Sequence, residues 1–288
     1  MKEGDVTADP VSPANLNLYE LARMNGENIR ERYESTRERA GDAADALERF
    51  CQRVERDGRV AINTKSTRFL SMLRNGYYPN PYDEARERAQ REGGDSETYL
   101  KQQQNDFYLR RVTFERTFAD GENFRYASLN IGGTGLSHYG PYCIVIGDPT
   151  EADRVALLPA NSLKRFMSDE PKLDQAALRR EVAPWLHRHH LTACKHAHEV
   201  AEVAEVDWPR MMCHAAETVE SFVEIILGSP VTPRLMVEIR VDEKRLDELV
   251  AKSIAGMLSD AERTEANARL EVFEELAKQN FDTLYRAV

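Results

Sequence analysis

The residues with the clearest chemical potential lie between Asn123 and Gly147, where glycine, aromatic and small polar side chains are most dense. Three glycines in this segment, at 132, 133 and 135, allow backbone conformations that other residues avoid and let a ligand come close. The hydrogen-bonding and stacking side chains around them are Tyr126, Asn130, His138 and Tyr139. The segment predicts a small-molecule pocket. The alternative is a hairpin loop with ordinary core or rim aromatics.

A carboxylate inside an apolar strand pattern is the second chemical feature. In the segment 221–228, Phe222, Glu224 and Ile226 share one face of the predicted strand, and the residues between them share the other. Burying an ionised carboxylate costs much free energy unless it is paired or used. Glu224 is therefore expected to face a polar cleft or, as an ordinary surface residue, solvent at a sheet edge. Glu238 lies in a similar apolar run, and we interpret it as a solvent-facing residue on a half-buried strand.

Residues 187–198 hold a dense group of potential zinc ligands. Three of them, His190, Cys194 and His198, would share one face of a helix. The complete group is His187, His189, His190, Cys194, His196 and His198. Their spacing matches no known zinc-finger or protease motif, so we interpret them as a polar surface of titrating histidines and assign no metal ligands. A zinc-dependent enzyme centred on this group stays an alternative.

These residues need a scaffold, and the pattern predicts an α+β fold with a small, split antiparallel sheet embedded in many helices. Predicted strands lie at 60–64, 124–129, 142–146, 155–158 and 221–227, and residues 235–241 fit a strand or a short helix. Helices are expected at 15–58 with a break near Gly41, 66–73, 83–118, 173–185, 192–206, 208–217, 242–258 and from 259 to the C-terminus. We divide the chain into an N-terminal helical region (1–58), an α+β catalytic-type domain with helical insertions (59–245) and C-terminal helices (246–288).

Three pieces of this pattern resemble the mono-ADP-ribosyltransferase superfamily, as found in bacterial toxins. A late strand bears a glutamate and is followed by a glycine turn and a further strand; a middle strand is rich in hydroxyls and precedes a Tyr-Gly pair; an early strand precedes a short helix. The matching segments are Val223–Val231 with Glu238–Val241, Tyr126–Asn130 with Tyr139–Gly140, and Val60–Thr64 with Leu73–Gly76. The resemblance spans about residues 58–245, with large helical insertions.

This resemblance implies roles for particular residues. Glu224 matches the glutamate that polarises the ribose 2′-hydroxyl of NAD and stabilises the oxocarbenium-like transition state as nicotinamide leaves. Tyr126 would frame nicotinamide beside it. The family usually places Arg or His on the early strand, whereas this chain has Asn63 there. The residues expected to contact NAD, which is consumed as a substrate, are Asn63, Arg68, Ser128, Asn130, Tyr139 and Gly140.

Composition limits the partners of such an enzyme. The net charge of −10 argues against binding nucleic acid by bulk electrostatics and favours a protein acceptor, although nucleic acid stays open. No apolar run suggests a membrane span or a cleavable signal, and the four cysteines form no CxxC pair. We therefore expect a cytoplasmic protein, or a toxin or effector delivered without a cleavable signal, for which a neutralising partner is plausible. A non-catalytic interaction module with a degenerate nucleotide pocket is the other alternative.

Overall fold

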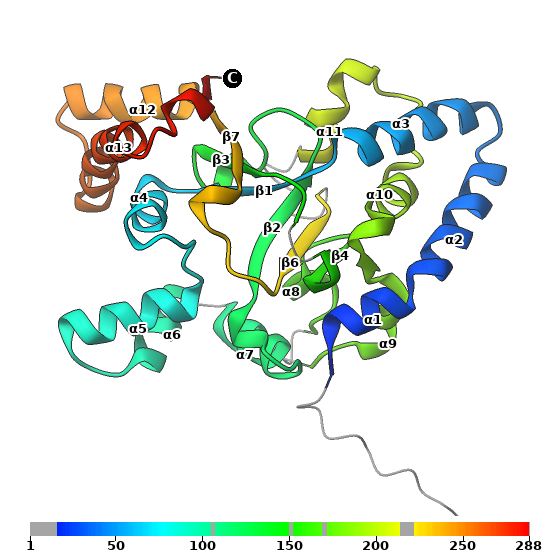
Figure 1. Ribbon diagram of the computed structural model, residues 1–288, viewed down its shortest axis with the longest axis horizontal. Coiled ribbons are helices and arrows are strands. Elements are labelled where there is room, and N and C mark those ends of the chain that lie inside the picture. The colour runs from blue at the N-terminus through cyan, green and yellow to red at the C-terminus, as the bar shows by residue number, and fades with distance from the viewer. Residues whose placement is uncertain (1–15, 105–106, 150–151, 169–171, 214–221, 288) are drawn as a thin grey trace, which may run out of the picture.

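The computed structural model describes residues 16–104, 107–149, 152–168, 172–213 and 222–287, which build one eight-stranded sheet surrounded by helices (Figure 1). The strands are β1 (Arg59–Thr64), β2 (Arg125–Asn130), β3 (Tyr142–Ile146), β4 (Val155–Leu158), β5 (Ala183–Pro184), β6 (Glu224–Leu227), β7 (Met236–Val241) and β8 (Tyr285–Ala287). They follow the order β5-β4-β6-β2-β1-β3-β7-β8. Every pair is antiparallel except β7 with β8. The predicted α+β class is confirmed, and the sheet is larger than predicted.

Most of the predicted helices are present, with boundary residues that act as expected. Gly58 follows α3, Gly76 ends α4 in the left-handed conformation, and Ser259 forms a capping box with Glu262. The α-helices are α1 (Leu18–Met24), α2 (Gly26–Arg39), α3 (Ala44–Asp57), α4 (Ser66–Asn75), α5 (Pro81–Glu92), α6 (Ser96–Gln104), α7 (Tyr108–Arg116), α8 (Ser162–Arg165), α9 (Gln175–Glu181), α10 (Arg188–His196), α11 (Trp208–Cys213), α12 (Glu243–Ile254) and α13 (Asp260–Lys278). Within the described ranges, no helix is long and apolar enough to cross a bilayer.

Three segments differ from the sequence prediction. Residues 183–184 form β5 instead of helix because Pro184 adopts an extended conformation, and a proline also disfavours helix at the residue before it. Helix α10 begins and ends earlier than the predicted 192–206. Residues 235–241, for which strand and short helix were both open, are mainly strand. The short strand β8 was missed because three residues are too few to show alternation. Residues 214–221, in two predicted elements, lie outside the described ranges.

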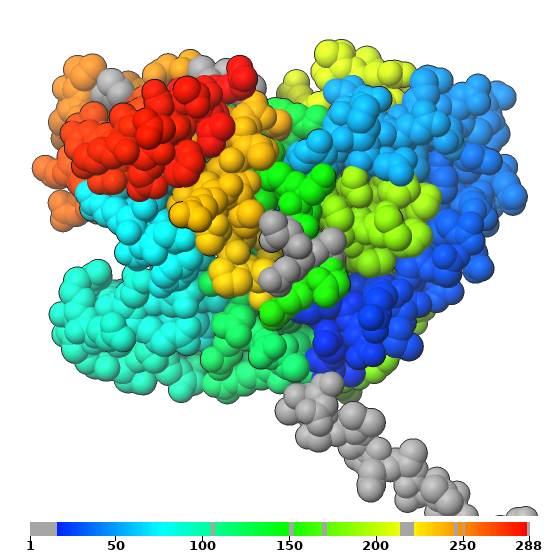
Figure 2. Space-filling view, viewed as in Figure 1, coloured from blue at the N-terminus to red at the C-terminus, as the bar shows by residue number. Residues whose placement is uncertain are grey.

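The two faces of the sheet are unlike each other. One face carries the larger apolar core, which includes Leu129, Ile144 and Ile225 and is covered by α2, α3, α4, α10, α11 and α13. This core runs from Ile29 to Leu276, so the three predicted regions of the chain share it. Figures 1 and 2 show α12 and α13 gathered at one corner of the molecule beside α4. The other face carries a smaller apolar cluster with α1, α7, α8 and α9, and leaves room for polar side chains.

Candidate functional site

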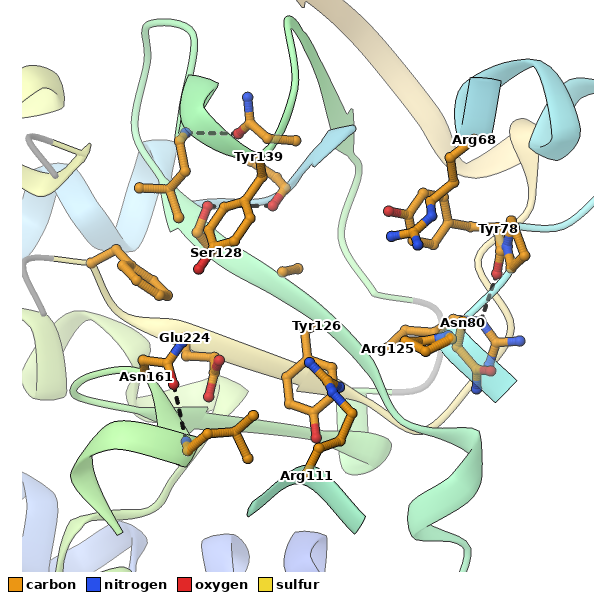
Figure 3. Close-up of a pocket in the computed structure, with 18 residues that line it drawn as sticks. Arg68, Tyr78, Asn80, Arg111, Arg125, Tyr126, Ser128, Tyr139, Asn161 and Glu224 are labelled. Carbon is orange, nitrogen blue, oxygen red and sulfur yellow. Dashed lines mark hydrogen bonds between the residues drawn. The ribbon is translucent and has the colours of Figure 1, made fainter. Parts of the chain in front are cut away.

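Strand register brings three of the predicted site residues, Tyr126, Ser128 and Glu224, together on the second face of the sheet. Ser128 on β2 lies directly opposite Glu224 on β6 and also opposite Ala61 on β1, so these side chains point to the same side. Tyr126 lies two residues before Ser128 on the same face. Figure 3 shows Tyr126 between Glu224 and a group of side chains from the opposite wall. The predicted shared face of Phe222, Glu224 and Ile226 fits this register.

A cavity of about 180 Å³ lies over these residues. Its volume is below the range of about 300–1,000 Å³ that is usual for pockets of whole small ligands, so it fits one ring-sized group. Tyr139 is 45% exposed and stands at the edge of the cavity, where a larger ligand would extend outward. The other principal lining residues are Asn63, Arg68, Tyr78, Asn80, Arg111, Arg125, Tyr126, Ser128, Asn161, Phe222 and Glu224.

Glu224 is the buried carboxylate of the cavity. It is only 4% exposed, and β6 lies between β4 and β2, so the sheet-edge alternative is wrong. Burial raises the pKa of Glu224 to about 7, against the lowering effects of hydrogen bonds from Ser162 and of the positive charge of Arg111. The backbone N–H of Ser162 donates to Glu224 Oε2 over 2.8 Å. Burial therefore brings the titration of this carboxyl group close to neutral pH.

A buried ionic group supports the floor of the cavity beside Glu224. Arg111 on α7 donates to Glu115 Oε1 over 3.0 Å, and its guanidinium carbon lies 4.5 Å from the centre of the Tyr126 ring. The hydroxyl of Tyr126 donates to the same carboxylate over 2.8 Å, and that of Tyr82 donates over 2.7 Å. Tyr126 therefore uses its hydroxyl and one side of its ring within the protein. Only the remainder of its surface is free to frame a ligand.

The opposite wall of the cavity is basic and aromatic. Arg68 on α4 pairs with Glu84 and lies over the Tyr78 ring at 5.9 Å. Arg125 is buried and donates to the carbonyl oxygen of Tyr78 over 2.9 Å. The Arg68 side chain is 31% exposed, whereas that of Arg125 is 8% exposed. Arg68 is thus the more exposed of the two wall arginines.

The early-strand residue Asn63 lines the cavity, but its side-chain amide forms hydrogen bonds with the glycine-rich segment. Its Nδ2 donates to the carbonyl oxygens of Thr134 and Gly140, and its Oδ1 accepts from the N–H of Leu136 over 2.7 Å. Asn130 and Gly140 do not line the cavity. Asn130 instead accepts hydrogen bonds from the N–H of Gly132 and from Arg240.

Gly140 has a packing role, which a substitution can test. A Cβ at this position would overlap the backbone of Thr64 at the end of β1, whereas one at Gly133 would meet open space. Gly133→Ala is expected to cost about 1 kcal/mol, because its φ of 72° is left-handed. Gly140→Ala is expected to cost about 2–3 kcal/mol because the backbone must shift. Urea unfolding of both variants measures the difference, and equal losses would contradict this role.

Several lining residues had no signal in the sequence. The pair Arg111 and Glu115 has the spacing of an ordinary surface pair, four residues apart on a helix. The structure instead buries Glu115, which is 1% exposed. Asn161, Tyr78 and Arg125 lie in loops or at a strand end, where only tertiary structure brings them to the cavity.

The histidine segment is not the polar surface that we expected, since His189 and His196 are buried. The predicted set of His190, Cys194 and His198 does not come together as a ligand group, since α10 ends at His196. His196 Nδ1 pairs with Glu199 instead.

No protein-family model matches this chain, and no curated protein matches it.

Proposed function

We propose that this chain is an ADP-ribosyltransferase that cleaves NAD and transfers ADP-ribose to a macromolecular acceptor. The observation that carries the proposal is the position of Glu224, a buried carboxylate opposite Ser128 in a cavity framed by Tyr126 and Tyr139. A carboxylate held next to a ring-sized space suits a reaction in which a planar base leaves a sugar.

In this reaction, the bond between ribose C1′ and the nicotinamide nitrogen breaks, and its electron pair leaves with nicotinamide. Positive charge then develops on the sugar, and the carboxylate of Glu224 stabilises it. The acceptor nucleophile forms the new bond to C1′ and loses its proton. Nicotinamide would fill the cavity beside Tyr126, Tyr139 would stack at the mouth, and Arg68 would contact a phosphate.

The acceptor is proposed to be a protein, because the net charge of −10 disfavours a phosphate backbone. A toxin or effector role, with a neutralising partner, fits an enzyme that modifies a macromolecule. It is compatible with action in the cytoplasm or with delivery into a target cell.

The direct test is incubation of the purified protein with NAD labelled in the nicotinamide ring. Release of free nicotinamide by the wild-type protein and its loss in Glu224→Gln are the expected results. If the protein binds NAD at neutral and alkaline pH but releases no nicotinamide, this proposal is wrong. The alternative, a non-catalytic interaction module with a degenerate nucleotide pocket, would then be favoured.

The rate of nicotinamide release is expected to depend on pH through Glu224. The reaction needs the ionised carboxylate, and the pKa of this group is raised to about 7. Below that value kcat/KM should fall about tenfold for each pH unit, and above it kcat/KM should level off. A profile that is flat between mildly acidic and mildly alkaline pH would contradict an essential Glu224 with this pKa.

A further inference from the structure

Three potential metal ligands meet between α3 and α10, away from the candidate site. The thiol sulfur of Cys51 and one ring nitrogen each of His189 and His190 all lie within 4.8 Å of one another. Among the described residues, no other group of three such side chains meets this criterion. None of the three lines the cavity that contains Glu224. Figure 1 shows α2, α3 and α10 at the right of the molecule and α4 and α5 at the left.

Burial makes this group different from histidines scattered on a surface. Cys51 is 4% exposed and His189 is 9% exposed. The Nδ1 atom of His189 is buried and has no hydrogen-bond partner. A buried ring nitrogen without a partner costs free energy, and a bound metal ion is one way to satisfy such a group.

The separations suit a small tetrahedral ion after a modest contraction. Zinc binds thiolate sulfur at about 2.3 Å and imidazole nitrogen at about 2.0–2.1 Å. Tetrahedral angles then place the ligand atoms about 3.3–3.6 Å apart. The three atoms lie within 4.8 Å of one another here, so each separation must shorten by at most about 1.5 Å. We expect side-chain rotation of Cys51 and His190 to supply this change.

Neighbouring groups would orient the ligands. His187 Nδ1 lies 3.0 Å from His190 Nδ1, so one ring donates to the other and the Nε2 of His190 remains for a metal. The Tyr33 ring packs on His190 at 5.0 Å between centroids. Glu48 beside them already accepts from Tyr33, Arg37 and Gln52. Cys51, His189 and His190 all line a hollow of about 310 Å³, which has room for a water molecule as a fourth ligand.

We propose that Cys51, His189 and His190 form a zinc site that holds α10 against α3, with water as the fourth ligand. On binding, the Cys51 thiol releases its proton to solvent and the sulfur coordinates as thiolate, while both imidazoles bind in the neutral form. The site is independent of NAD cleavage, because none of its three protein ligands lines the cavity of Glu224.

Cobalt titration of the full-length, chelator-treated wild-type protein tests the ligand set without any substitution. Binding of one Co²⁺ per chain should produce a thiolate-to-cobalt charge-transfer band, and zinc should abolish it. The melting temperature should rise with added zinc. The absence of the thiolate band, or no binding beyond an adventitious ion, would overturn the proposal.

Variants then identify the residues. Cys51→Ser and His189→Gln should each lower zinc affinity by more than about 100-fold, and His187→Gln by about tenfold as an orienting residue. Cys213→Ser and His198→Gln are the matched controls and should bind zinc as the wild type does. Wild-type affinity in Cys51→Ser would refute the site, and if that variant does not fold, the cobalt spectrum of the wild type decides.

Discussion

Glu224→Gln is expected to slow nicotinamide release from NAD by about 100- to 1,000-fold, with little change in KM. Glutamine keeps the size of the side chain and still accepts the N–H of Ser162, so the cavity keeps its shape. It lacks the negative charge that stabilises the sugar cation, and this charge matters most in the transition state. Single-turnover measurement at mildly alkaline pH, where the wild-type carboxylate is ionised, isolates this loss.

Glu238→Gln is the matched control for this substitution. Glu238 lies on β7, pairs with Arg240 and Arg286, and does not line the cavity. Its loss should leave nicotinamide release within about twofold of wild type, since it touches neither substrate nor cavity. Equal losses in both variants would show that the effect of Glu224 is not local.

Unfolding of Glu224→Gln separates lost chemistry from lost structure. The pKa of Glu224 is raised from 4.5 to about 7 in the folded protein, so the folded state binds more protons than the unfolded state between these values. Stability is therefore lost as pH rises through this window, by up to about 3 kcal/mol. The variant should be more stable than wild type at mildly alkaline pH and similar to it at acidic pH. If Glu224→Gln is less stable than wild type at mildly alkaline pH, burial of the ionised Glu224 carboxylate does not destabilise the protein as expected.

The sequence predicted the strands that carry this site better than the residues that support it from elsewhere in the fold. Apolar alternation located β2 and β6 and put Glu224 on the face opposite Val223 and Ile225, because strand periodicity is local. It did not predict that β6 lies in the middle of the sheet, since strand order depends on pairing between distant segments. This strand order decides whether Glu224 is exposed at a sheet edge or buried in the middle of the sheet.

The missed residues depend on tertiary contacts that leave no local trace. Arg111 and Glu115 are four residues apart, a spacing shared by many exposed pairs, and they become buried because β2 places Tyr126 against them. Asn63 has the residue type of a ligand contact, but the adjacent glycine segment uses its amide. Cys51 lies close to His189 and His190 only because α3 packs on α10.

Arg111→Met is expected to destabilise the protein by about 3–5 kcal/mol and to shift the pH profile of nicotinamide release to higher pH. Removal of the arginine leaves Glu115 buried without its ion-pair partner, the costly case for a buried pair. Arg111 also lowers the pKa of Glu224, so without it that pKa rises further and the active carboxylate forms only at higher pH. Urea unfolding and kcat/KM against pH measure the two effects.

The double variant Arg111→Met/Glu115→Gln distinguishes an unpaired charge from lost packing. If the cost comes from the uncompensated carboxylate, neutralising Glu115 should restore most of the stability, because Gln still accepts from Tyr82 and Tyr126. Arg74→Met is the surface control: Arg74 pairs with Glu271 in an exposed position and should change stability by less than about 1 kcal/mol. Additive losses in the double variant would mean that Arg111 acts through packing, and the pH shift should then be absent too. If the double variant recovers stability but not activity, the result would indicate that Arg111 controls the ionisation of Glu224.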